Sequence, residues 1–251
     1  MSIYIVTHKK FNQPKEPGYK SLLVGAYKGH VFGDVFDDEG DNISQKNANY
    51  CELTGLYWMW KNCKDDDIVG LTHYRRYFSN SYSKTKILTY KDAEKYLKKN
   101  DIILPFIQHM PVSIKEHYCE ESGLEKDLER IGKIIKDKYP EYYEDYNKFL
   151  DGQYTSFYNM FISKQEIFQD YCAWLFDILF ELEKQVDYSD YNDYQKRIFG
   201  FLSERLLNVY VRHKKLKVAY VGVIHTEETQ TLKKRVLTGL KRQLISGNNI
   251  R

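Results

Sequence analysis

The 251-residue chain lacks the features that mark several large classes of protein. It has only 5 prolines and no low-complexity stretch, which argues against long linkers and tails. No apolar run approaches the roughly 18 residues of a membrane-spanning helix, and the best candidate, 171–182, contains two acidic residues. The first residues, MSIYIVTH, are too few and too polar for a signal peptide. The length fits one large domain with a substantial core.

Cysteines are also few, and no two form a C-x-x-C pair. The four are Cys51, Cys63, Cys119 and Cys172. Their spacing argues against a zinc site or a redox dithiol. Their neighbours are typical of packed positions, so we expect four reduced, structural thiols in a cytoplasmic protein.

Charge is distributed unevenly along the chain. The net charge is +3, and residues 231–251 hold six basic residues and no acid, which leaves −3 on residues 1–230. An acidic body is a poor match for a nucleic-acid binder, so we expect no nucleic-acid partner. Leu232, Val236 and Leu240 would share one stripe of a basic helix over 232–245, a pattern typical of helices that lie on anionic membranes. Packing of that stripe on the body or on a second subunit is the alternative.

Hydrophobic patterns predict an alternation of strands and helices in the first half of the chain. We expect strands at 3–7, 22–26, 68–71, 101–105, 157–163 and 217–225, and helices at 47–62, 92–100, 165–185 and 193–212. Residues 113–150 are highly charged and mostly helical in pattern, with a break at Pro140. This order predicts an α/β fold with a mainly parallel central sheet, a helical insertion and a basic C-terminal helix.

Ligands of such sheets bind beyond the carboxyl ends of the strands. Thr7 and His8 follow the first predicted strand, and His225 ends the last one. The strand at 68–71 runs directly into the segment 73–76, HYRR, which places two guanidinium groups and an imidazole at a strand terminus. Arginine binds phosphate through paired hydrogen bonds, so this segment indicates a diphosphate site. Surface arginines paired with the acidic run at 65–67 are the alternative.

The predicted helix at 193–212 carries a polar stripe opposite an apolar face. Its members are Arg197, Gly200, Glu204 and Asn208. A carboxylate, a cation and a glycine that permits close approach can line a cleft. A solvated face with an ordinary ion pair is the alternative.

Two more polar residues lie in largely apolar segments. Asn159, within the aromatic segment 157–162, would bond a ligand hydroxyl or cap a turn. Glu52, in the predicted helix 47–62, would bond a sugar or a base, or form a salt bridge on the helix surface. The chain has no G-x-S-x-G, Walker A, Rossmann or H-E-x-x-H motif, and no Asp-x-Asp follows the strand at 68–71.

Four blocks of sequence carry a resemblance to a known family. They are NYCELTGLYWMWKN at 49–62, VGLTHYRRYF at 69–78, YNMFI at 158–162 with YCAWLF at 171–176, and RIFGFLSERLL at 197–207. In length and order they resemble a bacterial family of glycosyltransferases found among capsular and exopolysaccharide biosynthesis proteins. The resemblance runs from the first predicted strand to the last.

This resemblance implies a GT-A-like glycosyltransferase fold. It would comprise a nucleotide-binding half at about 1–110 and an acceptor half at about 111–230, followed by the basic tail 231–251. HYRR stands where that fold usually has its metal-binding Asp-x-Asp, so we expect no divalent metal and no other cofactor. Arg75, Arg76 and His73 would then stabilise the leaving diphosphate.

The resemblance also implies roles for single residues. Glu204 looks like the counterpart of the carboxylate that acts as the base in many inverting enzymes of this fold. The diphosphate would be bound by His73, Arg75, Arg76 and His225. The nucleoside and sugars would contact Thr7, His8, Glu52, Asn159 and Arg197.

Together these features predict a cytoplasmic enzyme, peripheral at the inner face of the membrane. It would move a hexose, with galactose or galactofuranose as candidates, from a nucleotide sugar, most simply a UDP-sugar, to a growing, lipid-linked surface polysaccharide. The alternative is a scaffold of a polysaccharide assembly complex that keeps the fold without catalysis.

Overall fold

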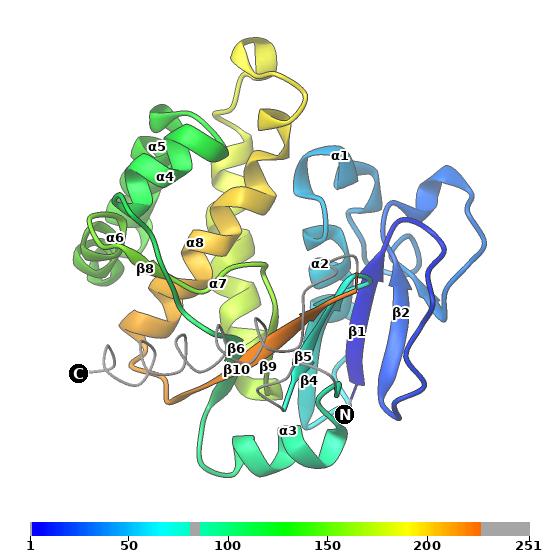
Figure 1. Cartoon of the computed structure of the whole chain (residues 1–251). Coiled ribbons are helices and arrows are strands. Elements are labelled where there is room, and N and C mark those ends of the chain that lie inside the picture. Colours follow the sequence, from blue (N-terminus) through cyan, green and yellow to red (C-terminus); the bar gives the residue numbers. More distant parts are fainter. Residues whose placement is uncertain (1, 81–85, 227–251) are drawn as a thin grey trace.

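A mixed β-sheet of eight strands runs through the part of the protein that the structure describes, residues 2–80 and 86–226 (Figure 1). The structure is a computed structural model. The strands of the sheet are β1 (Ser2–Thr7), β2 (Tyr19–Leu23), β3 (Val35–Phe36), β4 (Ile68–His73), β5 (Arg76–Ser79), β6 (Ile102–Pro105), β9 (Phe161–Lys164) and β10 (Val218–His225). A separate antiparallel ribbon pairs β7 (Gln108–His109) with β8 (Tyr154–Thr155).

Helices cover the sheet and extend beyond one end of it. The α-helices are α1 (Asn47–Tyr50), α2 (Leu53–Asn62), α3 (Tyr90–Leu97), α4 (Ile114–Glu121), α5 (Glu125–Lys138), α6 (Tyr143–Leu150), α7 (Gln165–Glu183) and α8 (Ile198–His213). Short 3-10 turns are η1 (Ala26–Lys28), η2 (Ser44–Lys46), η3 (Pro140–Tyr142), η4 (Tyr188–Asp190) and η5 (Gln195–Arg197). The predicted helix at 232–245, and with it the tail 231–251, lies outside the described residues.

The sheet is parallel in its first half and mixed in its second. β3, β2, β1 and β4 run parallel to one another, as predicted. β4 then pairs antiparallel with β9, β9 with β6, and β10 with β5, while β6 and β10 are parallel. The expectation of a mainly parallel sheet is therefore wrong for the second half. The cause is topological, because β5 folds back from β4 in a hairpin and β9 returns from the helical insertion in the opposite direction.

Both faces of the sheet are buried, which explains the continuous apolar runs in its strands. All six residues of β1 are buried. On one face, Val6 and Leu71 join the core that α2, α7 and α8 complete. On the other face, Ile3 and Ile5 pack in a second core with residues of α3 and β5.

The helical insertion predicted at 113–150 is confirmed. α4, α5 and α6 lie on the side of α7 and α8 that faces away from β1 and β2 (Figure 1). The buried carboxylate of Asp127 ties this region together, since it accepts hydrogen bonds from the hydroxyls of Tyr118 and Tyr191 and from the N–H of Leu124. None of the helices in the described part of the chain has the length and hydrophobicity needed to cross a membrane. All four cysteines are free thiols.

The single helix predicted over 47–62 is wrong, because the chain breaks between α1 and α2. At Cys51 the backbone has φ 53° and ψ −126°, which no helix accommodates. The side-chain amide of Asn47 donates to the carbonyl of Cys51 at 2.8 Å and so stabilises the break. After the break, the buried carboxylate of Asp37 accepts from the backbone N–H of Gly25 and from the hydroxyl of Thr54, which fixes α2 to the loop after β2.

The strand predicted over 157–163 begins only at Phe161. Tyr158 and Asn159 have φ of 85° and 49°, values that a strand cannot contain. The side chain of Asn208 in α8 holds this irregular segment, since it both accepts from the N–H of Ser156 and donates to its carbonyl, each at 2.9 Å. Both departures from the predicted elements lie beside the cavity described next.

Candidate active site

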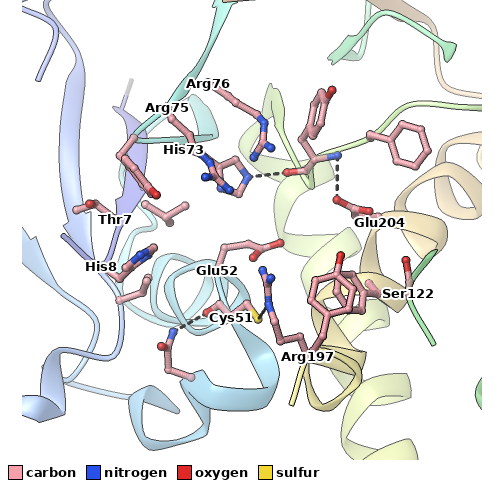
Figure 2. A pocket seen from close by; sticks show the side chains of 18 of the residues that line it. Thr7, His8, Cys51, Glu52, His73, Arg75, Arg76, Ser122, Arg197 and Glu204 are labelled. Atoms are coloured by element: carbon pink, nitrogen blue, oxygen red, sulfur yellow. Dashed lines mark hydrogen bonds between the residues drawn. The ribbon is translucent and has the colours of Figure 1, made fainter. Parts of the chain in front are cut away.

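A cavity of about 710 Å³ opens where β1 and β4 end, between the sheet and the helical region (Figure 2). Eight of the ten predicted site residues line it: Thr7, His8, Glu52, His73, Arg75, Arg76, Arg197 and Glu204. Seven of these residues belong to one of two walls, and Glu52 comes from the break between α1 and α2. The strand-end wall comprises Thr7, His8, His73, Arg75 and Arg76. The helical wall comprises His117, Phe157, Tyr194, Arg197, Phe201, Glu204 and Arg205.

The geometry of the β4–β5 hairpin explains why three of these groups gather at one point. His73 and Arg76 are directly paired across the hairpin, so their side chains lie on the same face of the sheet. Arg75 lies in the turn between them. The Nε atom of Arg76 is buried and has no hydrogen-bond partner among the described residues. The wall therefore presents a cation whose hydrogen-bonding capacity is not used up by the protein around it.

Tyr158 connects the strand-end wall to the helical wall. The Nε2–H of His73 donates to the carbonyl of Tyr158 at 2.6 Å. The backbone N–H of Tyr158 donates to Glu204 Oε1 at 3.1 Å. Its ring lies 4.5 Å from the guanidinium of Arg76. A tyrosine with positive φ is strained, and these contacts hold it in place. Burial lowers the pKa of His73, which fits a neutral imidazole that donates from Nε2.

Glu204 lies on α8 as one member of a mostly buried ion pair. Its Oε2 accepts from Arg205 Nη1 at 3.0 Å, and its side chain is 20% exposed. Burial raises the pKa of the Glu204 carboxyl; Arg205 acts against this rise, and the charge of Glu52 adds to it. A carboxylate with a raised pKa takes up a proton more readily near neutral pH, which is the property required of a general base.

Glu52 reaches the cavity because the chain breaks between α1 and α2. Its Oε1 accepts from Asn159 Nδ2 at 2.7 Å, and the same amide group donates to the carbonyl of Gly200 at 3.0 Å. At Gly200 a β-carbon would lie 3.5 Å from Cys51, an ordinary contact distance, so α8 packs directly beside the break. Arg197 Nε donates to Cys51 Sγ at 3.2 Å and holds its guanidinium near Glu52 (Figure 2).

Some predicted residues act on the site indirectly. Asn159 and His225 are not among the residues that line the cavity. Asn159 positions Glu52 instead, and the ring of His225 lies edge-on to Tyr158 at 5.6 Å. The hydroxyl of Thr7 lines the cavity but is used locally, because it bonds the backbone of Lys9 and turns the chain after β1.

Sequence reasoning missed several residues of the helical wall. Arg205 had a signal, since it directly follows the carboxylate singled out as a base, but its side chain points from the buried face of α8 back to Glu204. Tyr158 had none, because nothing in its neighbourhood predicts a positive φ at an aromatic residue. His117 comes from a segment that the sequence marks only as charged and helical. Tyr194 falls in the helix predicted at 193–212, but α8 begins only at Ile198, so Tyr194 lies in the turn before it.

No group of three or more His, Cys, Asp and Glu side chains in residues 2–80 and 86–226 is arranged to hold a metal ion. The acidic run at 65–67 precedes β4 and so lies at the opposite end of that strand from the cavity.

Comparisons with known proteins give the same fold. The structure is similar to the apo structure of the bifunctional glycosyltransferase WbbM, with a TM-score of 0.84 and 31% sequence identity. The similarity covers 90% of this chain and 45% of that one, so the chain spans a little under half the length of WbbM. No curated protein matches the chain. The expected glycosyltransferase-like α/β fold is confirmed at this level. A family model described as a domain of unknown function, DUF4422, matches residues 2–215, and the chain belongs to that family.

Proposed function

We propose that the protein is a glycosyltransferase that moves a hexose from a nucleotide sugar, most simply a UDP-sugar, to a growing surface-polysaccharide acceptor. One observation carries the proposal. Within a fold similar to that of a glycosyltransferase, one cavity holds two arginines at a strand end and a buried carboxylate with a raised pKa on the facing helix. Galactose and galactofuranose are the candidate sugars.

The donor would bind along the strand-end wall. Arg75 and Arg76 would bind the diphosphate, and the unused Nε of Arg76 supplies a donor for one of its oxygens. Negative charge grows on this diphosphate as the bond to the sugar breaks, and fixed cations stabilise it. His8 would lie near the nucleoside, while Glu52 and Arg197 would bond sugar hydroxyls.

Glu204 would act as the general base on the acceptor. An acceptor hydroxyl oxygen attacks the anomeric carbon of the donor, and its proton passes to the Glu204 carboxylate. The bond between the anomeric carbon and the phosphate oxygen breaks, and its electron pair leaves with the nucleoside diphosphate. Arg205 holds the carboxylate in one orientation for this step.

The reaction is proposed to need no divalent metal, since arginines occupy the place of acidic ligands. Turnover is expected to persist in excess chelator. Loss of turnover on chelation, with recovery on adding manganese or magnesium, would contradict this part of the proposal.

The acceptor is proposed to be lipid-linked, with the tail 231–251 attracting the protein to an anionic membrane from the cytoplasmic side. The tail carries six basic residues, and each contributes about 1 kcal/mol near such a surface. Sedimentation with anionic vesicles should decrease with salt and disappear when 231–251 is deleted. Equal sedimentation of the truncated protein would reject the membrane role.

The function is tested by incubating the protein with a panel of nucleotide sugars and measuring donor hydrolysis and transfer. Turnover with one or more donors is expected. The non-catalytic scaffold is the second candidate, and it predicts UDP binding by calorimetry with no hydrolysis of any donor. Neither binding nor turnover with any member of the panel would reject both.

A further inference from the structure

The helical wall carries an exposed aromatic surface that has no role in the donor binding proposed above. Five large hydrophobic side chains are strongly exposed in the described residues, and of these Tyr194 alone lines the cavity; it is 52% exposed. Its ring lies 4.9 Å from that of Phe201, at an angle of 44°. The guanidinium of Arg197 lies 5.7 Å and 5.4 Å from these two ring centres.

This surface is held in place by the backbone around it. The side-chain oxygen of Asn192 accepts from the N–H groups of Tyr194 and Gln195, at 3.0 and 2.9 Å. Gln195 in turn accepts from the N–H of Asn192 at 3.1 Å, which closes the turn. Asn49 in α1 donates to the carbonyl of Lys196 at 2.8 Å and fixes the turn to the rest of the protein. An exposed aromatic ring on a fixed turn loses little entropy when it binds a ligand.

Polar groups of a neighbouring helix line the same cavity as these rings. His117 and Glu121 of α4 line the cavity, as does Ser122 at the end of that helix. Arg205 Nη2 lies 3.4 Å from His117 Nδ1 and can only donate, so Nδ1 accepts and the ring's own N–H is at Nε2. Burial, and then the charge of Arg205, lowers the pKa of His117, which keeps this ring neutral. Its Nε2–H makes no hydrogen bond with a described residue and can donate to a hydroxyl.

An apolar platform in the same cavity as hydroxyl-bonding groups matches the chemistry of a sugar ring, whose C–H face packs on aromatic rings while its hydroxyls point sideways. The position of Glu204 indicates whether a sugar on this platform belongs to the donor or to the acceptor. Through Tyr158 it is connected to the wall that carries His73, and through Arg205 to His117. Figure 2 places it between the Arg75–Arg76 hairpin and Ser122. A sugar bound on the Ser122 side of Glu204 is therefore separated by this carboxylate from Arg75 and Arg76, the cations proposed for the diphosphate.

We infer that Tyr194 and Phe201 form a stacking platform for a hexose ring of the acceptor glycan, with His117 donating to one of its hydroxyls. The inference rests on the proposed function for the identity of the sugar as the acceptor. It assigns the acceptor side of the cavity to Tyr194, Phe201 and α4.

The test measures sugar binding directly. Methyl β-galactopyranoside, methyl β-galactofuranoside and methyl β-glucopyranoside are titrated into the full chain, and binding is followed by saturation-transfer NMR. At least one glycoside should bind the wild-type protein. Tyr194→Ala should weaken its affinity about fivefold or more, because the stacking surface is lost. Tyr194→Phe, which keeps the ring, should bind like the wild type.

Tyr90→Ala is the matched control, since Tyr90 is 39% exposed and does not line the cavity. A thermal melt of each variant checks that it is folded. The inference is overturned if no glycoside binds, or if folded Tyr194→Ala binds as well as the wild type. UDP titration of the wild-type protein reports on the proposed function separately: glycoside binding without UDP binding would keep the platform and reject the glycosyltransferase.

Discussion

The two walls of the cavity hold positive charge in different ways. On the strand-end wall, the buried Nε of Arg76 has no hydrogen-bond partner among the described residues. On the helical wall, Arg205 is buried and its guanidinium is paired with Glu204 at 3.0 Å. A buried polar group without a partner is costly until a ligand supplies one, whereas a paired charge is already satisfied. The contrast indicates that the strand-end wall is the one built to receive an anion.

Carboxylates follow the same contrast. Asp127 accepts three hydrogen bonds inside the helical region and is fully buried, so it is a structural group that a ligand does not reach. Glu52, at the break between α1 and α2, accepts one hydrogen bond through Oε1, and its Oε2 accepts none from the described residues. Burial and full pairing thus mark Asp127 as a group that holds the fold, whereas Glu52 keeps an oxygen that can bind substrate.

The strongest test of the contrast removes the base from the helical wall. Glu204→Gln keeps the size of the side chain and its contact with Arg205 but removes its basicity. Turnover should fall on the order of a hundredfold or more, while UDP affinity measured by calorimetry stays close to that of the wild type. Glu181→Gln, at an exposed ion pair with Lys184 on α7, is the control and should retain full turnover. Near-normal turnover in Glu204→Gln would leave Glu204 a structural role only.

The second test removes a cation from the strand-end wall. Arg76→Ala deletes a charged donor, and hydrogen bonds to charged groups contribute about 1.5–3 kcal/mol, so UDP should bind about tenfold to a hundredfold more weakly. Methyl glycoside binding on the helical wall should change little. Arg212→Ala, at a surface ion pair with Asp145, is the control. Equal losses of UDP and glycoside binding in Arg76→Ala would mean that the two walls do not act separately.

Local sequence patterns predicted the regular part of this fold. The strands β1 and β4 were found because they are short, continuous apolar runs, and the helix α7 because its apolar residues recur at helical spacing. Strand β5 was not predicted, and the direction of β9 was not found, because strand direction depends on how the chain returns from a turn or an insertion. The break at Cys51 and the positive φ at Tyr158 also escaped, since long-range contacts hold both.

The site was predictable where it follows a strand. His73, Arg75 and Arg76 come directly after an apolar run, and strand ends gather at one edge of a sheet. On the helical wall, the residues other than Arg197 and Glu204 are brought together by tertiary packing. Tyr194 meets Phe201 only because the turn at 192–195 is fixed against α1, and no spacing in the sequence encodes that contact.

A third test compares how tightly two helices beside the cavity, α2 and α8, are packed. A β-carbon at Gly55 of α2 would lie 2.8 Å from Val24 and 3.0 Å from Leu22, so α2 would have to move away from the sheet. Gly55→Ala should destabilise the protein by about 1–3 kcal/mol. At Gly200 of α8 the nearest contact of such a carbon is 3.5 Å, an ordinary distance. Gly200→Ala should therefore keep or raise stability, since alanine favours a helix. Urea unfolding measures both, and equal destabilisation would contradict the difference.

The smallest expected effect concerns the pH dependence of stability. Burial lowers the pKa of His73 in the folded protein. As the pH falls, the unfolded chain takes up this proton first. The contribution of His73 to the free energy of unfolding is therefore complete above its unfolded pKa and is lost as the pH falls toward its folded pKa. Burial also lowers the pKa of His8 and of His117, and it raises the pKa of Glu204.

Urea unfolding from about pH 8 to about pH 5.5, across the range in which histidine titrates, isolates this contribution. The experiment is best done in the Glu204→Gln background, which removes the opposing titration. The urea midpoint should fall with pH, and it should fall less steeply when His73→Gln is added. If His73→Gln leaves the slope unchanged, His73 does not titrate with a lowered pKa, and the neutral donor to Tyr158 that connects the two walls would have to be abandoned.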